Sequence, residues 1–210
     1  DLFSQSGLTS PHALYVEDDW TWDNFRDAAR KLTRPNPDGT FAVLGSTLHL
    51  PRTWIFANGG REVDDPHRPT KAYYDTPEAL EALHFLHQLI HADEAMRGPG
   101  GRVTTALGAE EILAFTRGQI GMVSRWLSFL PSLADASFEV GMVPYPRGPG
   151  DEGRYASDLG MFGLAISRTT ENLEAAWRFV AFVTGPEGAE ISGDLPGATP
   201  PRPVGLRWIG

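Results

Sequence analysis

Short apolar segments alternate with capped, amphipathic helical segments along this chain, and that alternation constrains the fold more than any other feature. The clearest helix is predicted over residues 77–92. Thr76 can accept hydrogen bonds from the free amides of the first turn, Pro77 suits the first helical position, and Glu78 complements the positive end of the helix dipole. The predicted apolar stripe consists of Leu80, Leu83, Leu86, Leu89 and Ile90.

Further helices and strands follow the same pattern. Thr21 is a predicted N-cap, followed at helical spacing by Trp22, Phe25, Ala28, Ala29 and Leu32. Other helices are predicted over residues 50–57 and 109–116, and one that opens at Thr170 or Asn172. Predicted strands cover residues 41–45, 120–123, 138–143 and 162–166. Strands that alternate with helices predict an α/β fold, with Leu83, Leu86 and Leu89 packed on its sheet.

The composition allows a packed core and disfavours two classes of partner. Hydrophobic residues make up 41% of the chain and charged residues 21%, as in ordinary globular proteins. The 18 Lys and Arg against 27 Asp and Glu give a net charge of −9, which disfavours nucleic acid and anionic membrane surfaces. Because the chain has no Cys, thiol catalysis, Cys-ligated zinc and disulfides are excluded.

Signals of metal binding or catalysis are weak. His84, His87 and His91 lie near one helical face, where a solvated surface is favoured over a metal site. Adjacent carboxylates point in different directions, so they do not form the facing pair of a glycosidase. These pairs are Asp18–Asp19, Asp64–Asp65 and Glu110–Glu111. Neither a Gly-x-Ser-x-Gly elbow nor a Gly-x4-Gly-Lys phosphate loop occurs.

Trp126 is the most informative aromatic residue because it directly follows a predicted strand, in Ser124-Arg125-Trp126. Ligands of α/β proteins bind at the carboxyl ends of strands. An indole face beside a guanidinium and a hydroxyl suits a sugar, whose C–H face stacks on rings while its hydroxyls take polar partners. The alternative is a core tryptophan that covers the sheet edge, and the residues alone leave the two interpretations equal.

Several short stretches are informative through their order and spacing. They are Thr-Trp-Asp-Asn-Phe at 21–25, Ala-Asn-Gly-Gly at 57–60, Thr-Pro-Glu-Ala at 76–79, Phe-Thr-Arg-Gly-Gln-Ile-Gly-Met at 115–122, Val-Gly-Met-Val-Pro-Tyr-Pro at 140–146, Gly-Leu-Ala-Ile-Ser at 163–167, Ala-Ala-Trp-Arg-Phe-Val at 175–180 and Thr-Gly-Pro-Glu-Gly at 184–188. Together, over residues 1–198, they resemble the extracellular solute-binding protein family that contains the sugar-binding components of ABC importers.

The resemblance implies a periplasmic-binding-protein fold of the type II-like kind, with two α/β lobes that close on a ligand. Residues 1–157 would form most of the carboxy-terminal lobe, and residues 158–210 a crossover strand and helix of the amino-terminal lobe. Much of the amino-terminal lobe would then lie outside this chain. Since the chain opens with Asp1 rather than Met, we interpret it as processed or excised.

The resemblance also nominates ligand-binding residues. Ser124, Arg125 and Trp126 follow the Met-containing strand, although Arg125 departs from the common Gly-x-Trp form and would also suit an acidic sugar. The helix before Asn58 faces the cleft in relatives, and Asp158 lies at the crossover, where it would accept sugar hydroxyls or serve as a hinge carboxylate. The further nominated residues are His49, Arg52 and Trp54.

The function implied is capture of a small solute, a mono- or oligosaccharide, and its delivery to the membrane permease of an ABC importer. The resemblance places the protein outside the cytoplasm, in the periplasm or as a cell-surface lipoprotein, without enzymatic activity, cofactor or metal. A carbohydrate-active hydrolase and an interaction module without a small ligand are the alternatives.

Residues 159–184 carry much apolar surface that a whole family member would bury in its other lobe. These side chains are Met161, Phe162, Leu164, Ile166, Trp177, Phe179, Val180 and Phe182. Burial stabilises such side chains by roughly 1.5–3 kcal/mol each. We therefore expect the isolated chain to self-associate through this segment, or to dock it against another chain.

Overall fold

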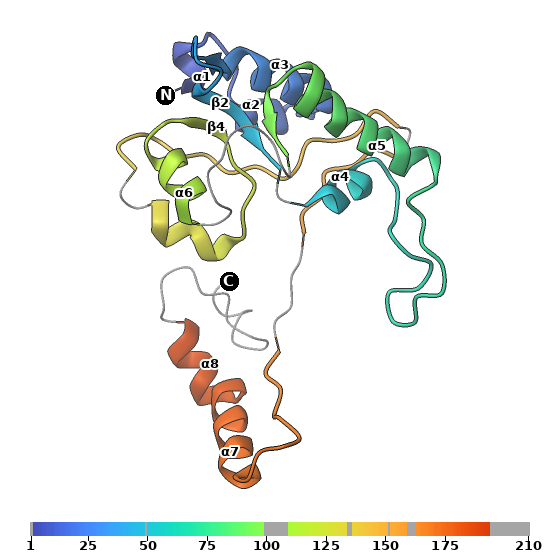
Figure 1. Cartoon of the computed structure of the whole chain (residues 1–210), viewed down its shortest axis with the longest axis vertical. Coiled ribbons are helices and arrows are strands. Elements are labelled where there is room, and N and C mark those ends of the chain that lie inside the picture. The colour runs from blue at the N-terminus through green and yellow to red at the C-terminus, as the bar shows by residue number, and fades with distance from the viewer. Residues whose placement is uncertain are drawn as a thin grey trace. The chain divides into compact units, whose positions relative to one another are not determined.

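The computed structural model describes residues 2–48, 50–98, 109–133, 136–150, 152–158 and 163–193 (Figure 1). The chain divides into two compact units. Unit 1 comprises Asp1–Ser124 and Asp135–Asp158, and unit 2 comprises Arg125–Ala134 and Leu159–Gly210. The assignment of residues 1–157 and 158–210 to two lobes of a whole family member stays a prediction.

The sheet of unit 1 is built around β2 (Phe41–Thr47). β2 pairs antiparallel with β1 (Arg34–Pro35) and parallel with β3 (Met96–Arg97) and β4 (Ile120–Met122). Residues 43–47 are all buried, as expected of a strand covered on both faces. The strands predicted at 41–45 and 120–123 are therefore confirmed.

Helix α3 (Trp22–Leu32) lies against this sheet and matches its prediction. The Thr21 hydroxyl accepts a hydrogen bond from the Asn24 amide at 3.4 Å, and all five predicted apolar positions are buried. Contact with β2 is so close that a Cβ at Gly45 would lie 1.9 Å from the Ala29 carbonyl oxygen. Gly45 is therefore required where helix and strand meet.

Helices α4 (Pro51–Ala57) and α5 (Pro77–His87) pack together, and α5 continues as the π-helical η1 (Gln88–Ala92). The buried face of α5 differs from the predicted leucine stripe, because the small Ala79 and Ala82 lie buried in the core cluster while Leu80 is exposed. Leu86 and Leu89 are buried in one core cluster with Met96 of β3, as predicted. Leu83 is only half-buried, so its predicted place in that core is wrong.

The remaining helices are short. Unit 1 also contains α1 (Leu2–Gln5), α2 (Pro11–Val16) and α6 (Ala109–Thr116), the last as predicted. A 3-10 helix, η2, spans Leu127–Leu133. In unit 2, α7 (Leu173–Thr184) follows Asn172, one of its two predicted starts, and packs against α8 (Pro186–Gly193).

Two predicted strands do not form among the residues that the structure describes. Residues 138–143 have no regular structure, and the nearest pairing is an isolated bridge between Tyr145 and Ala156. Residues 163–166 are likewise irregular, and 161–162 lie outside the described residues. Both predictions rested on local apolar character, whereas a strand requires a neighbouring strand to pair its backbone groups.

Candidate functional site

An ion pair joins the first turn of α4 to the last residue of unit 1. The Arg52 Nη2 donates to both carboxylate oxygens of Asp158, at 2.9 and 2.8 Å. The side chains are 36% and 14% exposed, respectively, so the pair lies at the surface with its carboxylate largely enclosed. The sequence nominated the two residues separately, and the fold brings them together across 106 positions of the chain.

The loop that follows α4 adds two polar groups to this pair. The Tyr74 hydroxyl donates to the Glu62 carboxylate, and this bond, together with burial, raises the pKa of Tyr74. The hydrogen bond to Asp158 raises the pKa of the Arg52 guanidinium, with smaller contributions from Glu62 and Tyr74. Arg52, Asp158, Glu62 and Tyr74 are together called the Arg52 cluster, in which the guanidinium stays charged.

Ser124 lies just after β4, and its hydroxyl is hydrogen-bonded to that of Tyr145. The ring of Tyr145 packs edge-on against Trp54, with centroids 5.5 Å apart. Trp54 itself is 3% exposed and also contacts Trp22, Phe25 and Phe85. The prediction that Trp54 contacts a ligand directly is therefore wrong for this structure, because neither face of its ring is open.

The other nominated residues lie in unit 2 or outside the described residues. Arg125 and Trp126 belong to unit 2, and both side chains are partly buried, so the Trp126 ring is not enclosed in a core. His49 lies outside the described residues. Sequence reasoning missed Glu62, Tyr74 and Tyr145, although Tyr145 stands in the quoted Val-Pro-Tyr-Pro stretch.

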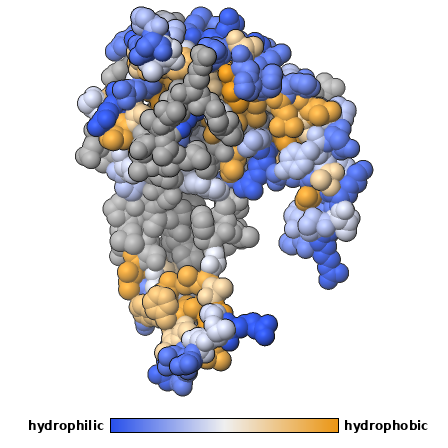
Figure 2. All heavy atoms as spheres, viewed as in Figure 1, coloured by the Kyte–Doolittle hydropathy of each residue, from blue (hydrophilic) through white to orange (hydrophobic). Residues whose placement is uncertain are grey.

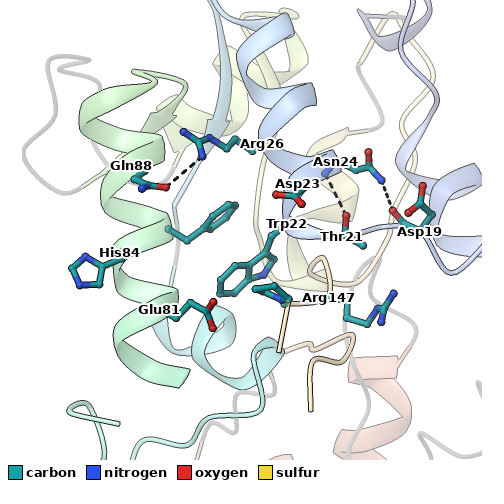
Figure 3. A pocket seen from close by; sticks show the side chains of 13 residues that line it. Asp19, Thr21, Trp22, Asp23, Asn24, Arg26, Glu81, His84, Gln88 and Arg147 are labelled. Carbon is teal, nitrogen blue, oxygen red and sulfur yellow. Dashed lines mark hydrogen bonds between the residues drawn. The ribbon is translucent and has the colours of Figure 1, made fainter. Parts of the chain in front are cut away.

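Unit 1 also contains a groove of about 760 Å³ between the start of α3, α5 and the loop at residues 147–149 (Figure 3). The stacked rings of Trp22 and Phe85, 4.5 Å apart, lie among its lining. Arg26 links α3 to η1 by donating to the Gln88 side-chain oxygen at 3.4 Å. None of the nominated ligand residues lines this groove.

A family comparison decides what kind of protein this fold belongs to. Residues 1–190 match the bacterial extracellular solute-binding protein family. The chain belongs to that family. The described part of this solute-binding protein has no helix that is both long and apolar enough to cross a membrane.

Solved structures agree on the two-lobed solute-binding fold. MalE3 of T. maritima with bound maltose is 24% identical in sequence to this chain, with a TM-score of 0.67. The match covers 99% of this chain and 52% of the MalE3 chain. An ABC substrate-binding protein of Listeria monocytogenes in complex with cycloalternan is 23% identical, with a TM-score of 0.65 over 95% and 48%. The maltose/maltodextrin-binding domain MalE of Bdellovibrio bacteriovorus, bound to maltotriose, is 17% identical, with a TM-score of 0.66 over 88% and 49%.

These solute-binding proteins are about twice as long as the part of each that the chain matches. The predicted fold is confirmed, and the chain spans about half of a two-lobed protein of this kind. The family and these neighbours are binding proteins rather than enzymes.

Proposed function

We propose that the complete protein binds a carbohydrate outside the cytoplasm and delivers it to the permease of an ABC importer, without chemical conversion. Family membership and the sugar-bound neighbours support this function. The observation that carries it is the ion pair between Arg52 and Asp158 at the surface of unit 1.

The Arg52 cluster has the chemistry that sugar hydroxyls require. A carboxylate oxygen accepts more than one hydrogen bond, so Asp158 can accept from a hydroxyl while it remains bound to Arg52. A guanidinium has five N–H donors, and the two hydrogen bonds to Asp158 use only those on Nη2. Tyr74 is 44% exposed and adds an aromatic ring on which a sugar face can stack.

Separately from the Arg52 cluster, we propose Ser124, Arg125 and Trp126 as ligand contacts, and the Trp126 ring offers a stacking surface there. The extra guanidinium of Arg125 also suits the carboxylate of an acidic sugar, because Arg binds carboxylates with charge-assisted hydrogen bonds. Neutral and acidic sugars are therefore the two ligand classes to compare.

The function is tested by a thermal-shift screen on the full-length parent protein with maltose, maltotriose, galacturonate and glycerophosphocholine. A ligand that binds only the native state raises the melting temperature, and at 100 times Kd it stabilises by about 2.7 kcal/mol. We expect at least one sugar to raise it in proportion to the logarithm of its concentration. A rise with glycerophosphocholine alone would contradict a carbohydrate ligand, and hydrolysis of either maltosaccharide would contradict a transport role.

We further propose that the isolated chain self-associates through residues 159–184. In the described part of this segment α7 has no buried residue, and Leu173, Trp177 and Phe179 are 63%, 61% and 63% exposed. Figure 2 shows an area of hydrophobic residues, coloured orange, over α7. Sedimentation of the chain should give a concentration-dependent mass, and Trp177→Ser should reduce it. A monodisperse monomer at all concentrations would contradict the proposal.

A further inference from the structure

Two histidine rings lie side by side where α5 passes into η1. His87 is the last residue of α5, His91 lies within η1, and both side chains are exposed. Their ring centroids are 4.6 Å apart, with the ring planes at 44°. Within the described residues neither imidazole takes part in a hydrogen bond or ion pair, so its nitrogens are available to a ligand.

The π-helical turn holds this pair in place. The amide of Asp93 donates to the Gln88 carbonyl, five residues earlier, at 2.9 Å. Leu89 lies in the same turn and is fully buried, so it anchors the inner side of the turn in the core. His87 and His91 lie on the solvent side. Single π-helical turns inside helices occur frequently at functional sites.

The ring separation matches that of two imidazoles on one metal ion. Imidazole nitrogens bind transition metals at about 2.0–2.1 Å. If the two metal–nitrogen bonds form a right angle, the ring centroids lie about 4.5 Å apart. If they form the tetrahedral angle, the centroids lie about 5.2 Å apart. The observed 4.6 Å is short enough for one ion to bind a nitrogen of each ring. Imidazole nitrogens are good ligands for Cu(II), Ni(II) and Zn(II).

We propose that His87 and His91 bind a divalent transition metal ion, Cu(II) in preference to Ni(II) and Zn(II), with water in the other coordination positions. Copper stands first because it binds nitrogen ligands most tightly among the first-row divalent ions. No group of three or more metal-binding side chains occurs in the described part of the chain, so the protein supplies two ligands.

The carboxylate that directly follows η1, that of Asp93, is already in use. The Asp93 carboxylate, 7% exposed, accepts hydrogen bonds from Arg26 at 2.6 and 3.0 Å. Metal bound by His87 and His91 would connect the end of α5 to η1 and stabilise the native state by mass action. The proposal does not depend on the carbohydrate function, because neither ring belongs to the Arg52 cluster.

The test is calorimetric titration of the untagged chain with CuCl2, NiCl2 and ZnCl2, accompanied by melting curves. A tag-free chain is needed because a polyhistidine tag would bind the same ions. We expect one Cu(II) per chain and a higher melting temperature with copper. His87→Ala and His91→Ala should each weaken binding by at least about tenfold, since even the loss of a second-shell partner costs 10- to 100-fold.

His84→Ala is the matched control. His84 also lies on α5 and is exposed, but it lines the groove beside α3 and takes no part in the ring contact between His87 and His91. Its variant should bind copper as the parent chain does, and circular dichroism should show that all variants fold. Equal weakening by His84→Ala, unchanged binding by the folded double variant His87→Ala/His91→Ala, or tighter binding of Zn(II) than of Cu(II) would overturn the proposal.

Discussion

Helices α3 and α7 have similar lengths and both carry tryptophan and phenylalanine, yet they lie in opposite environments. α3 buries Trp22, Phe25 and three aliphatic side chains against the sheet of unit 1. α7, with Trp177, Phe179 and Phe182, has no buried residue. The comparison teaches that periodicity predicts a helix and its apolar face, whereas burial depends on a partner that the local sequence does not specify.

The largest difference between the units should appear when a tryptophan is removed from each helix. Trp22 is 3% exposed and stacked on Phe85, so Trp22→Ala should lower the free energy of unfolding by about 3–5 kcal/mol. Trp177 is 61% exposed, so at chain concentrations too low for self-association Trp177→Ala should cost about 0.5 kcal/mol or less. Urea unfolding followed by circular dichroism measures both. A Trp177 variant as unstable as the Trp22 variant would show that α7 is covered in solution.

Glycine substitutions sharpen the same contrast. An added methyl at Gly45 would collide with the Ala29 backbone, so Gly45→Ala should destabilise unit 1 by about 1–3 kcal/mol or prevent its folding. At Gly163 in unit 2 the added Cβ meets no described atom within 4 Å, and Gly163→Ala should leave stability nearly unchanged. Thermal melts of the two variants compare them directly. Equal melting temperatures would contradict the close contact between α3 and β2.

Helix capping gives the smallest expected difference. The Thr76 hydroxyl accepts from the Ala79 amide at the start of α5, so Thr76→Ala should cost about 0.5–2 kcal/mol. Asn172 precedes α7 without a side-chain capping bond, and Asn172→Ala should cost less than about 0.5 kcal/mol. Urea titrations of both variants resolve this difference. A larger loss for Asn172→Ala would mean that α7 is capped in solution.

The sequence predicted the features that depend on neighbouring residues, such as where helices begin. Caps located α3 and α5, because an N-cap hydroxyl needs only the amides of the next turn. Asn172 marked the start of α7 although its side chain makes no capping bond. The strands predicted at 138–143 and 162–166 do not form in their described residues, because pairing depends on distant segments. The buried face of α5 was also mispredicted, since small alanines allow closer packing than the more apolar leucines beside them.

The candidate site also has features that the sequence predicted and features that only the fold shows. Resemblance to a family nominated Arg52 and Asp158, but their ion pair follows from the fold, which brings distant segments together. Trp54 was nominated because its helix faces the cleft in relatives, whereas its burial depends on Trp22, Phe25 and Phe85. Tyr74 and Glu62 lie in a loop without a recognised motif, so only the structure identified them.

The most direct test of the proposed function is calorimetric titration of the full-length parent protein with maltotriose, for the wild type and for Asp158→Asn. This variant keeps the side-chain shape but removes the charge that accepts from Arg52 and from a ligand hydroxyl. Hydrogen bonds to charged groups contribute about 1.5–3 kcal/mol, which predicts roughly 10- to 100-fold weaker binding. Lys31→Ala, which breaks an exposed ion pair with Asp27, is the control and should bind as the wild type does. Measurable wild-type binding that Asp158→Asn leaves unchanged would contradict the assigned site, and absence of wild-type binding would exclude maltotriose as the ligand.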